Sequence, residues 1–346
     1  MAGQDRVLSQ RELNRALLAR QLLLERASLP LPRAVERLGG IQTQYAPSAY
    51  VGLWSRLEGF EREALTRALQ RRALIQATLI RNTIHIVSRR DYWPLVLAIR
   101  RGRMDWSRRI QKTETHELER AAVRLREFLA DGPRRQAEIV AALGTEVWRP
   151  GIAIWVDLVR VPPSGTWDRR RADLFGLAEQ WVGPQPELSE DDALEHLVRR
   201  YLGAFGPAPA PDVADWAGLK VGAIAPALAR LKLRRFLDEQ GRELVDLPRA
   251  PLPPPDTPAP VRFLPTWDAT LLVHGRGTGI LPEEYRSRIF HVKTPHSFST
   301  FLVDGAVAGT WRSDEGRVRL DPFKRLARTS RAELEEEGER LAAFHA

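Results

Sequence analysis

The chain has 346 residues, of which 43% are hydrophobic and 28% charged, a composition typical of a globular protein large enough for more than one core. It contains no cysteine, which excludes disulfides, thiolate zinc sites and a cysteine nucleophile. Its 53 basic residues outnumber its 44 acidic residues, and the resulting net charge of +9 favours a polyanionic partner such as nucleic acid.

The sequence also argues against a membrane, a metal and a cofactor. No run of about 18 apolar residues is present, so we expect no membrane-spanning helix and no membrane partner. The N-terminal residues are too highly charged for a signal peptide, which predicts a cytoplasmic, nucleoid-associated protein. The seven histidines show no metal-ligand spacing, and we expect neither metal nor cofactor.

The first segment of the chain, residues 1–112, predicts three helices followed by a two-stranded hairpin. The predicted helices cover 12–25, 32–38 and 61–71, and the strands cover 74–80 and 83–87. Ser9 is the expected N-cap of the first helix, with Glu12 completing a capping box. Arg81 and Asn82 form the turn of the hairpin. Three helices and a two-stranded wing make a winged helix, and a connecting helix follows it.

The same order of elements is predicted twice more, in residues 113–188 and 189–250. The second unit has predicted helices at 118–129, 135–143 and 150–160 and a wing at 161–175. The third has predicted helices at 194–204, 211–217 and 221–231 and a hairpin at 233–247. A Gly-Pro break at 132–133 recurs at 206–207, in the same place within the unit, which indicates a repeat.

The C-terminal part follows a linker at 251–260, where six prolines exclude a regular element. Residues 261–346 predict a mixed α/β segment. Strands and hairpins are expected in 263–281 and 299–312, and a charged helix in 329–346. The predicted fold class is α+β and mainly helical, with three tandem winged-helix units and this C-terminal mixed α/β segment.

Two glutamines after a double glycine are the candidate catalytic residues. Gln42 and Gln44 flank Thr43, and an extended backbone would place both carboxamides on one side. A carboxamide is not a strong base, but it can orient water and place partial negative charge beside a cationic centre. We expect neither side chain to be a core residue. The alternative is that both are ordinary surface residues near a turn.

The candidate DNA contacts are mostly arginines. Arg169, Arg170 and Arg171 follow Trp167 on the second wing, and this pattern suits phosphate contact along a groove. The alternative is a solvated charge run. His85, on a strand of the first wing, is a further candidate, with a structural histidine as its alternative. The remaining candidate DNA contacts are Arg81, Arg276 and Arg312.

Five segments together resemble the AlkZ-like (AlkZ/YcaQ) DNA glycosylases. They are GGIQTQYAPSAYVGLWSRL, TLIRNTIHIVSRRDYW, VPPSGTWDRRR, FLPTWDATLL and FLVDGAVAGTWR. The resemblance implies three tandem winged helices and an enzyme that removes N7-alkylguanine and unhooks interstrand crosslinks. The family's catalytic motif, two glutamines around an aliphatic residue, falls on Gln42 and Gln44. Thr43 departs from that pattern, and its hydroxyl needs a hydrogen-bond partner.

The resemblance implies a monofunctional, hydrolytic glycosylase that acts as a monomer on double-stranded DNA carrying alkylated purines. N7 alkylation makes the base cationic and a good leaving group, so a carboxamide pair suffices where a neutral base would need a general acid. No lysine lies near the glutamines, which argues against a Schiff-base lyase. The alternatives are a winged-helix transcription regulator, whose third unit would lack base-reading side chains on its last helix, and a non-catalytic DNA-binding protein.

Overall fold

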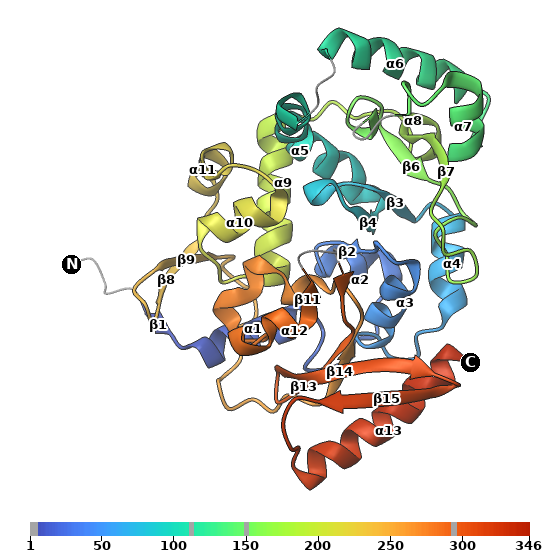
Figure 1. The fold of residues 1–346 in the computed structure, drawn as a ribbon. Coiled ribbons are helices and arrows are strands. Elements are labelled where there is room, and N and C mark those ends of the chain that lie inside the picture. The colour runs from blue at the N-terminus through green and yellow to red at the C-terminus, as the bar shows by residue number, and fades with distance from the viewer. Residues whose placement is uncertain (1–5, 111–113, 149–151, 292–295) are drawn as a thin grey trace.

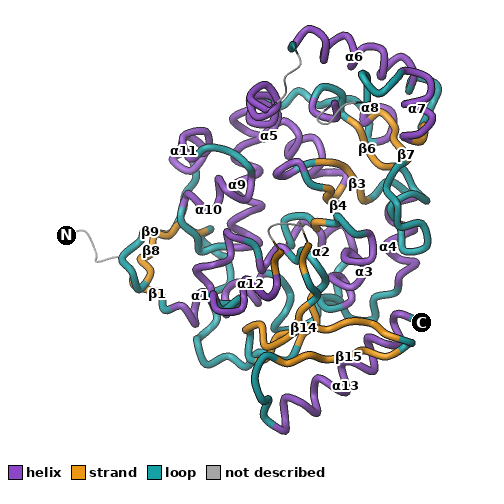
Figure 2. The backbone as a smooth tube through the Cα atoms, in the orientation of Figure 1, coloured by secondary structure: helices purple, strands orange, loops and turns teal. Residues whose placement is uncertain are grey.

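The computed structural model describes residues 6–110, 114–148, 152–291 and 296–346 (Figure 1). Helices account for most of the regular structure, and the strands lie in small groups between them (Figure 2). Within the described ranges the strands form four sheets, of two, three, four and six strands. The expectation of a mainly helical protein containing both helices and strands is confirmed.

The first segment contains the predicted helices and hairpin, together with a further short strand and a further helix. Its elements are α1 (Gln10–Arg20), α2 (Leu31–Arg37), β2 (Ile41–Gln42), α3 (Ala46–Trp54), α4 (Arg62–Gln70), β3 (Leu74–Thr78), β4 (Ile84–Ser88) and the connecting helix α5 (Arg89–Ile110). The capping box at Ser9 and Glu12 is confirmed. Helix α3 was not predicted, because nearly all its side chains are buried and it lacks the alternation of apolar and polar faces.

The second segment corrects one predicted helix. Its elements are α6 (Thr115–Phe128), β5 (Arg134–Arg135), α7 (Gln136–Leu143), β6 (Leu158–Arg160), β7 (Leu174–Leu177) and α8 (Ala178–Trp181). The helix predicted over 150–160 is wrong where the chain is described: 152–154 is a single 3-10 turn and 158–160 is a strand, while 150 and 151 lie outside the described residues. Pairing of β6 with both β3 and β7 outweighs the local helical pattern.

The third segment has the predicted three helices and hairpin. These are α9 (Glu190–Phe205), α10 (Ala210–Ala217), α11 (Val221–Arg230), β8 (Arg234–Asp238) and β9 (Glu243–Asp246). The N-terminal strand β1 (Val7–Leu8) pairs in parallel with β8, so the start of the chain extends the sheet of the third segment. The first and third segments are therefore joined by backbone hydrogen bonds.

The C-terminal segment is an antiparallel sheet covered by one helix. Strands β10 (Arg262–Leu264), β13 (Thr300–Val303), β14 (Ala306–Asp314) and β15 (Arg317–Pro322) lie in that order, and the predicted helix is α13 (Arg328–His345). Between them lie α12 (Arg286–Ile289), β11 (Phe290–His291) and β12 (His296–Ser297). The strands predicted across 263–281 are wrong beyond β10, because 269–271 and 273–278 are 3-10 turns.

One sheet joins the first two hairpins. Its strand order is β2-β4-β3-β6-β7-β5, and β3 pairs with β6 through Gln76 and Ala77. A single large core includes side chains from α1, β3, α5, α9 and β13. The order of helices and hairpins matches the one from which three winged-helix units were inferred, but the tandem winged-helix arrangement and the domain boundaries at 112, 188 and 250 stay predictions.

Candidate functional site

Strand β2 places Gln42 beside the hairpin of the first segment. Gln42 pairs with His85 of β4 in an antiparallel register, and the next residue, Thr43, donates its backbone N–H to the Ile84 carbonyl at 2.8 Å. The Gln42 side chain is only 7% exposed, so the expectation that it is not a core residue is wrong. Its Oε1 accepts a hydrogen bond from Nη2 of Arg81 at 3.1 Å, which satisfies the buried carboxamide.

Gln44 is exposed, as the sequence predicted, but its carboxamide is also held. Its Oε1 accepts the backbone N–H of Ile84, the first residue of β4, at 2.6 Å. Each glutamine oxygen thus has one fixed donor, and a carbonyl oxygen has two lone pairs. Both oxygens keep a lone pair that can accept a hydrogen bond from water. Thr43, between them, is buried and its hydroxyl has no hydrogen-bond partner in the structure.

Arg81 lies in the turn between β3 and β4, with a left-handed backbone conformation (φ 50°). Besides Gln42, its guanidinium donates to the Trp216 carbonyl at 2.8 Å. Burial lowers the pKa of Arg81, and the nearby carboxylate of Asp215 opposes that shift. Both terminal nitrogens donate within the protein, and one of them orients the Gln42 carboxamide; the DNA contact predicted for Arg81 stays a prediction.

His85 is buried, with 3% of its surface exposed. Burial, with the positive charge of Arg81 as a second cause, lowers its pKa to about 3. Its Nδ1 lies 3.1 Å from the Thr83 carbonyl oxygen, so we assign the ring proton to Nδ1. A neutral, buried imidazole offers no charge to a phosphate, which leaves the predicted DNA contact of His85 without support and favours the structural alternative.

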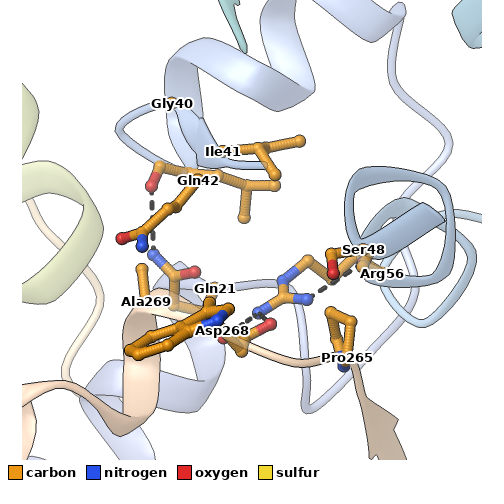
Figure 3. Close-up of a pocket in the computed structure, with 12 residues that line it drawn as sticks. Gln21, Gly40, Ile41, Gln42, Ser48, Arg56, Pro265, Asp268 and Ala269 are labelled. Atoms are coloured by element: carbon orange, nitrogen blue, oxygen red, sulfur yellow. Dashed lines mark hydrogen bonds and ion pairs between the residues drawn. The ribbon is translucent and has the colours of Figure 1, made fainter. Parts of the chain in front are cut away.

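A small space lies beside Gln42, between the first segment and the start of the C-terminal segment (Figure 3). Its volume of about 20 Å³ is enough for one water molecule. Gln42 and Ile41 lie on one side, and Arg56 with Asp268 on the other. The Arg56 guanidinium donates to both carboxylate oxygens of Asp268, at 2.9 and 3.0 Å, and both side chains are buried.

The Asp268 carboxylate also accepts the backbone N–H and the hydroxyl of Thr270. With all these donors around it, the carboxylate joins two segments and is not free to accept a proton from water. Sequence reasoning missed Arg56 and Asp268, because they are 212 positions apart in the chain. The segments GGIQTQYAPSAYVGLWSRL and FLPTWDATLL contain Arg56 and Asp268, but neither segment reveals that the two residues pair.

A larger pocket, called here the aromatic pocket, adjoins this space, and Ser48 and Pro265 line both. Aromatic rings from five places in the chain line it: Tyr45, Trp167, His296, Phe298, Trp311 and His345. Arg170 and Arg312 also line it. Three predicted DNA contacts, Trp167, Arg170 and Arg312, are therefore brought together next to the glutamines. The other aromatic residues were missed, because nothing in their local sequence indicates that they meet.

The remaining predicted DNA contacts lie outside both spaces. Arg169 and Arg171 are exposed on the loop between β6 and β7, and Arg171 forms an ion pair with Asp173 at 3.1 Å. Arg276 is exposed on a 3-10 turn and donates to Glu283 at 3.4 Å. Their exposure is compatible with phosphate contact, which stays a prediction. In the described part of the chain no cluster of ligand side chains suits a metal ion, and no helix is long and apolar enough to cross a membrane.

Comparison with protein families identifies the family of this chain. The family model described as "DNA glycosylase AlkZ-like" matches residues 35–344, which is most of the chain. The matched residues include Gln42, Gln44 and, apart from His345, the residues that line the aromatic pocket. The chain belongs to the AlkZ-like DNA glycosylase family. The resemblance drawn from the sequence is thereby confirmed, and the chain is an enzyme of the DNA glycosylase class.

The AlkZ-like fold extends over the whole chain. The structure is similar to that of the DNA glycosylase AlkZ of Streptomyces sahachiroi, with a TM-score of 0.82 and 19% sequence identity, and the match covers 98% of this chain and 97% of that one. No curated protein sequence matches the chain. As a DNA glycosylase, the AlkZ-like protein acts on DNA, and its excess of basic residues agrees with that substrate.

Proposed function

We propose that this AlkZ-like glycosylase hydrolyses the N-glycosidic bond of N7-alkylguanine in duplex DNA, interstrand crosslinks included, with Gln42 and Gln44 as its catalytic residues. One observation carries the proposal: each glutamine oxygen is held by one internal donor and keeps a second lone pair, and Gln42 lines a space large enough for one water molecule. The side chains that line this space include one carboxylate, that of Asp268, and it is engaged by Arg56.

The chemistry of a cationic base matches these weak catalytic groups. Alkylation at N7 gives guanine a positive charge, so the base leaves without protonation and the sugar develops oxocarbenium character. A glycosylase for such a base needs to orient a water molecule at C1′ and stabilise positive charge on the sugar. The negative end of a fixed amide dipole can orient the water and stabilise the cationic sugar. Preorganised dipoles of this kind stabilise a transition state by several kcal/mol in a site that excludes most water.

The two glutamines differ in their surroundings, and we assign them different roles. Gln42 is buried and oriented by Arg81, so its oxygen is the better placed to position water. Gln44 is exposed beside the start of β4, where the sugar of a bound nucleotide would approach, and its oxygen would stabilise the developing cation. The reaction is hydrolytic, since no lysine lines the space beside Gln42.

Removal of each carboxamide tests these roles. We expect Gln42→Ala and Gln44→Ala to lower single-turnover excision of 7-methylguanine by about 10- to 10³-fold, the size expected when an interaction worth ~1–4 kcal/mol is removed. Binding of the duplex should change little. Gln44→Asp should keep or alter activity rather than abolish it, because a carboxylate also stabilises a cation. Thermal unfolding checks the fold of Gln42→Ala, which loses a buried hydrogen bond.

The control is Gln70→Ala, which removes an exposed carboxamide at the end of α4. It should leave excision unchanged. Full activity in the Gln42→Ala, Gln44→Ala double variant would place the chemistry elsewhere. Release of another modified base, but not of 7-methylguanine, by the intact protein would show that the substrate proposed here is wrong.

A further inference from the structure

We propose that the aromatic pocket binds a planar aromatic ring next to the reacting nucleotide, either an aryl substituent carried on N7 of the guanine or a base unstacked from the duplex. The inference rests on the proposed function, because it takes the glutamine pair as the site of reaction. It adds a substrate feature that the glutamines themselves cannot recognise.

The pocket is contiguous with the proposed catalytic site. Tyr45, which forms part of its wall, directly follows Gln44 in the chain. Ser48 and Pro265 line both the pocket and the space beside Gln42. A nucleotide whose sugar faces the glutamines therefore has this pocket within reach of its base or of a group attached to the base.

The back of the pocket is rigid, while its front presents exposed rings. The Trp167 ring packs edge-on against Tyr50, with centroids 5.6 Å apart, and the Trp311 indole donates to the Leu264 carbonyl at 2.9 Å. In contrast, Tyr45 is 45% exposed and Phe298 is 38% exposed. Large apolar side chains left exposed around a recess point to a ligand that covers them.

The size of the pocket indicates a ring rather than a methyl group. Its volume of about 450 Å³ lies in the range of about 300–1,000 Å³ that small-molecule sites occupy. A 7-methyl group would leave it almost empty. A one- or two-ring planar group would make stacking contacts with Tyr45 and Phe298 and edge contacts with the fixed tryptophans.

The positive charge around the pocket indicates which kind of ring it would bind. Arg170 and Arg312 line it, and Arg170 donates to the Tyr45 hydroxyl at 2.8 Å with its guanidinium 5.7 Å from the Tyr45 ring centre. Burial, with the charges of Arg62 and Arg170, lowers the pKa of His345, so this imidazole adds no further positive charge at neutral pH. Two guanidinium groups favour a neutral or electron-rich ring over a cationic one.

Phe298→Ala tests the proposal with two lesions, 7-methylguanine and 7-benzylguanine, in the same duplex sequence. Single-turnover excision is measured for both, and Kd is measured with 2′-fluorinated lesions that resist hydrolysis. If the ring comes from the N7 substituent, excision and affinity should fall about 5- to 100-fold for the benzyl lesion and less than twofold for the methyl lesion, as expected when a stacking partner is removed. If the ring is an unstacked base, both lesions should be affected equally.

Trp106→Ala is the matched control, because Trp106 is also an aromatic residue that is 38% exposed, and it does not line the pocket. It should leave the ratio between the two lesions unchanged. The proposal is overturned if Phe298→Ala alters neither excision nor affinity for either lesion. If the proposed function is wrong, the wild-type protein should release neither base. The Kd values would still show in that case whether Phe298 contacts a ring.

Discussion

At the scale of single residues, the orientation of the Gln42 carboxamide depends on Arg81. A buried carboxamide without a partner would rotate or draw in water, and the Arg81 guanidinium removes that freedom by donating to its oxygen. The same guanidinium is anchored to the Trp216 carbonyl at the end of α10. The orientation of a proposed catalytic group from the first segment is thus set by a backbone carbonyl of the third.

Arg81→Met is expected to separate positioning from binding. The variant keeps most of the side-chain volume but loses both hydrogen bonds. We expect single-turnover excision of 7-methylguanine to fall about 5- to 50-fold, while the Kd for duplex DNA changes less than twofold. Arg81→Lys, which restores one donor, should recover part of the rate.

A phosphate contact by Arg81 predicts the opposite pattern. Kd would then rise and its salt dependence would weaken, with the excision rate at saturation unchanged. That outcome would confirm the DNA contact predicted for Arg81 from the sequence.

The loop between β6 and β7 is the element that presents the arginine run. Its backbone is ordered by internal hydrogen bonds: Gly165 donates to the carbonyls of Arg169 and Arg171, and the Ser164 hydroxyl also donates to the Arg171 carbonyl. The backbone groups of the loop are thus used internally, while the guanidinium groups stay exposed. The loop also positions Trp167 and Arg170 in the aromatic pocket. The same loop therefore presents the exposed arginines and forms part of the pocket wall.

Replacement of Arg169, Arg170 and Arg171 by Ala should weaken binding to lesion-containing and unmodified duplexes alike. The slope of log Kd against log salt should decrease by roughly one unit for each phosphate that the loop no longer neutralises. Fluorescence anisotropy titrations across a range of salt concentrations measure this slope. The control, with the same loss of charge, replaces Arg325, Arg328 and Arg331, which are exposed at the start of α13. Equal slopes in the two variants would mean that the loop run is only a solvated face.

At the scale of the whole molecule, the segments are not independent units. The six-stranded sheet joins the first two, β1 joins the first to the third, and the Arg56–Asp268 ion pair joins the first to the C-terminal segment. Buried histidines lie within this shared structure. His274 packs against Tyr201 and Phe205, at centroid distances of 5.7 and 4.6 Å, and burial lowers its pKa to about 3, as it does for His85.

These two histidines predict a loss of stability in mild acid. Their pKa is about 6.5 when unfolded and about 3 when folded, so below pH 6.5 the unfolded chain binds more protons and folding becomes less favourable. Each should cost about 2 kcal/mol of unfolding free energy at pH 5 relative to pH 8. Asp212 acts in the opposite direction, because burial raises its pKa to about 6, and it offsets part of this loss.

Urea denaturation at pH 8 and pH 5 measures the effect. His274→Gln should reduce the difference between the two pH values, whereas His116→Gln, on the exposed face of α6, should leave it unchanged. A pH difference that is the same in all three proteins would show that His274 is protonated as easily in the folded as in the unfolded state.

Most local elements, and the family, could be predicted from short stretches of the sequence. Apolar periodicity located most helices, alternation located the hairpins, and the capping box at Ser9 marked the start of α1, because each of these signals is contained within a few neighbouring residues. The glutamine motif and four further segments were enough to identify the AlkZ-like family. Exposure of Gln44 followed from its place near a turn.

The way in which these elements meet depends on tertiary packing and could not be predicted from the sequence. Residues 158–160 form a strand because β3 and β7 pair with them on both sides. Gln42 can be buried because Arg81 donates a hydrogen bond to its oxygen. Tertiary packing also pairs Arg56 with Asp268 and assembles the aromatic pocket from separate segments. Contacts between residues far apart in the chain depend on which surfaces pack together, and no local periodicity encodes that choice.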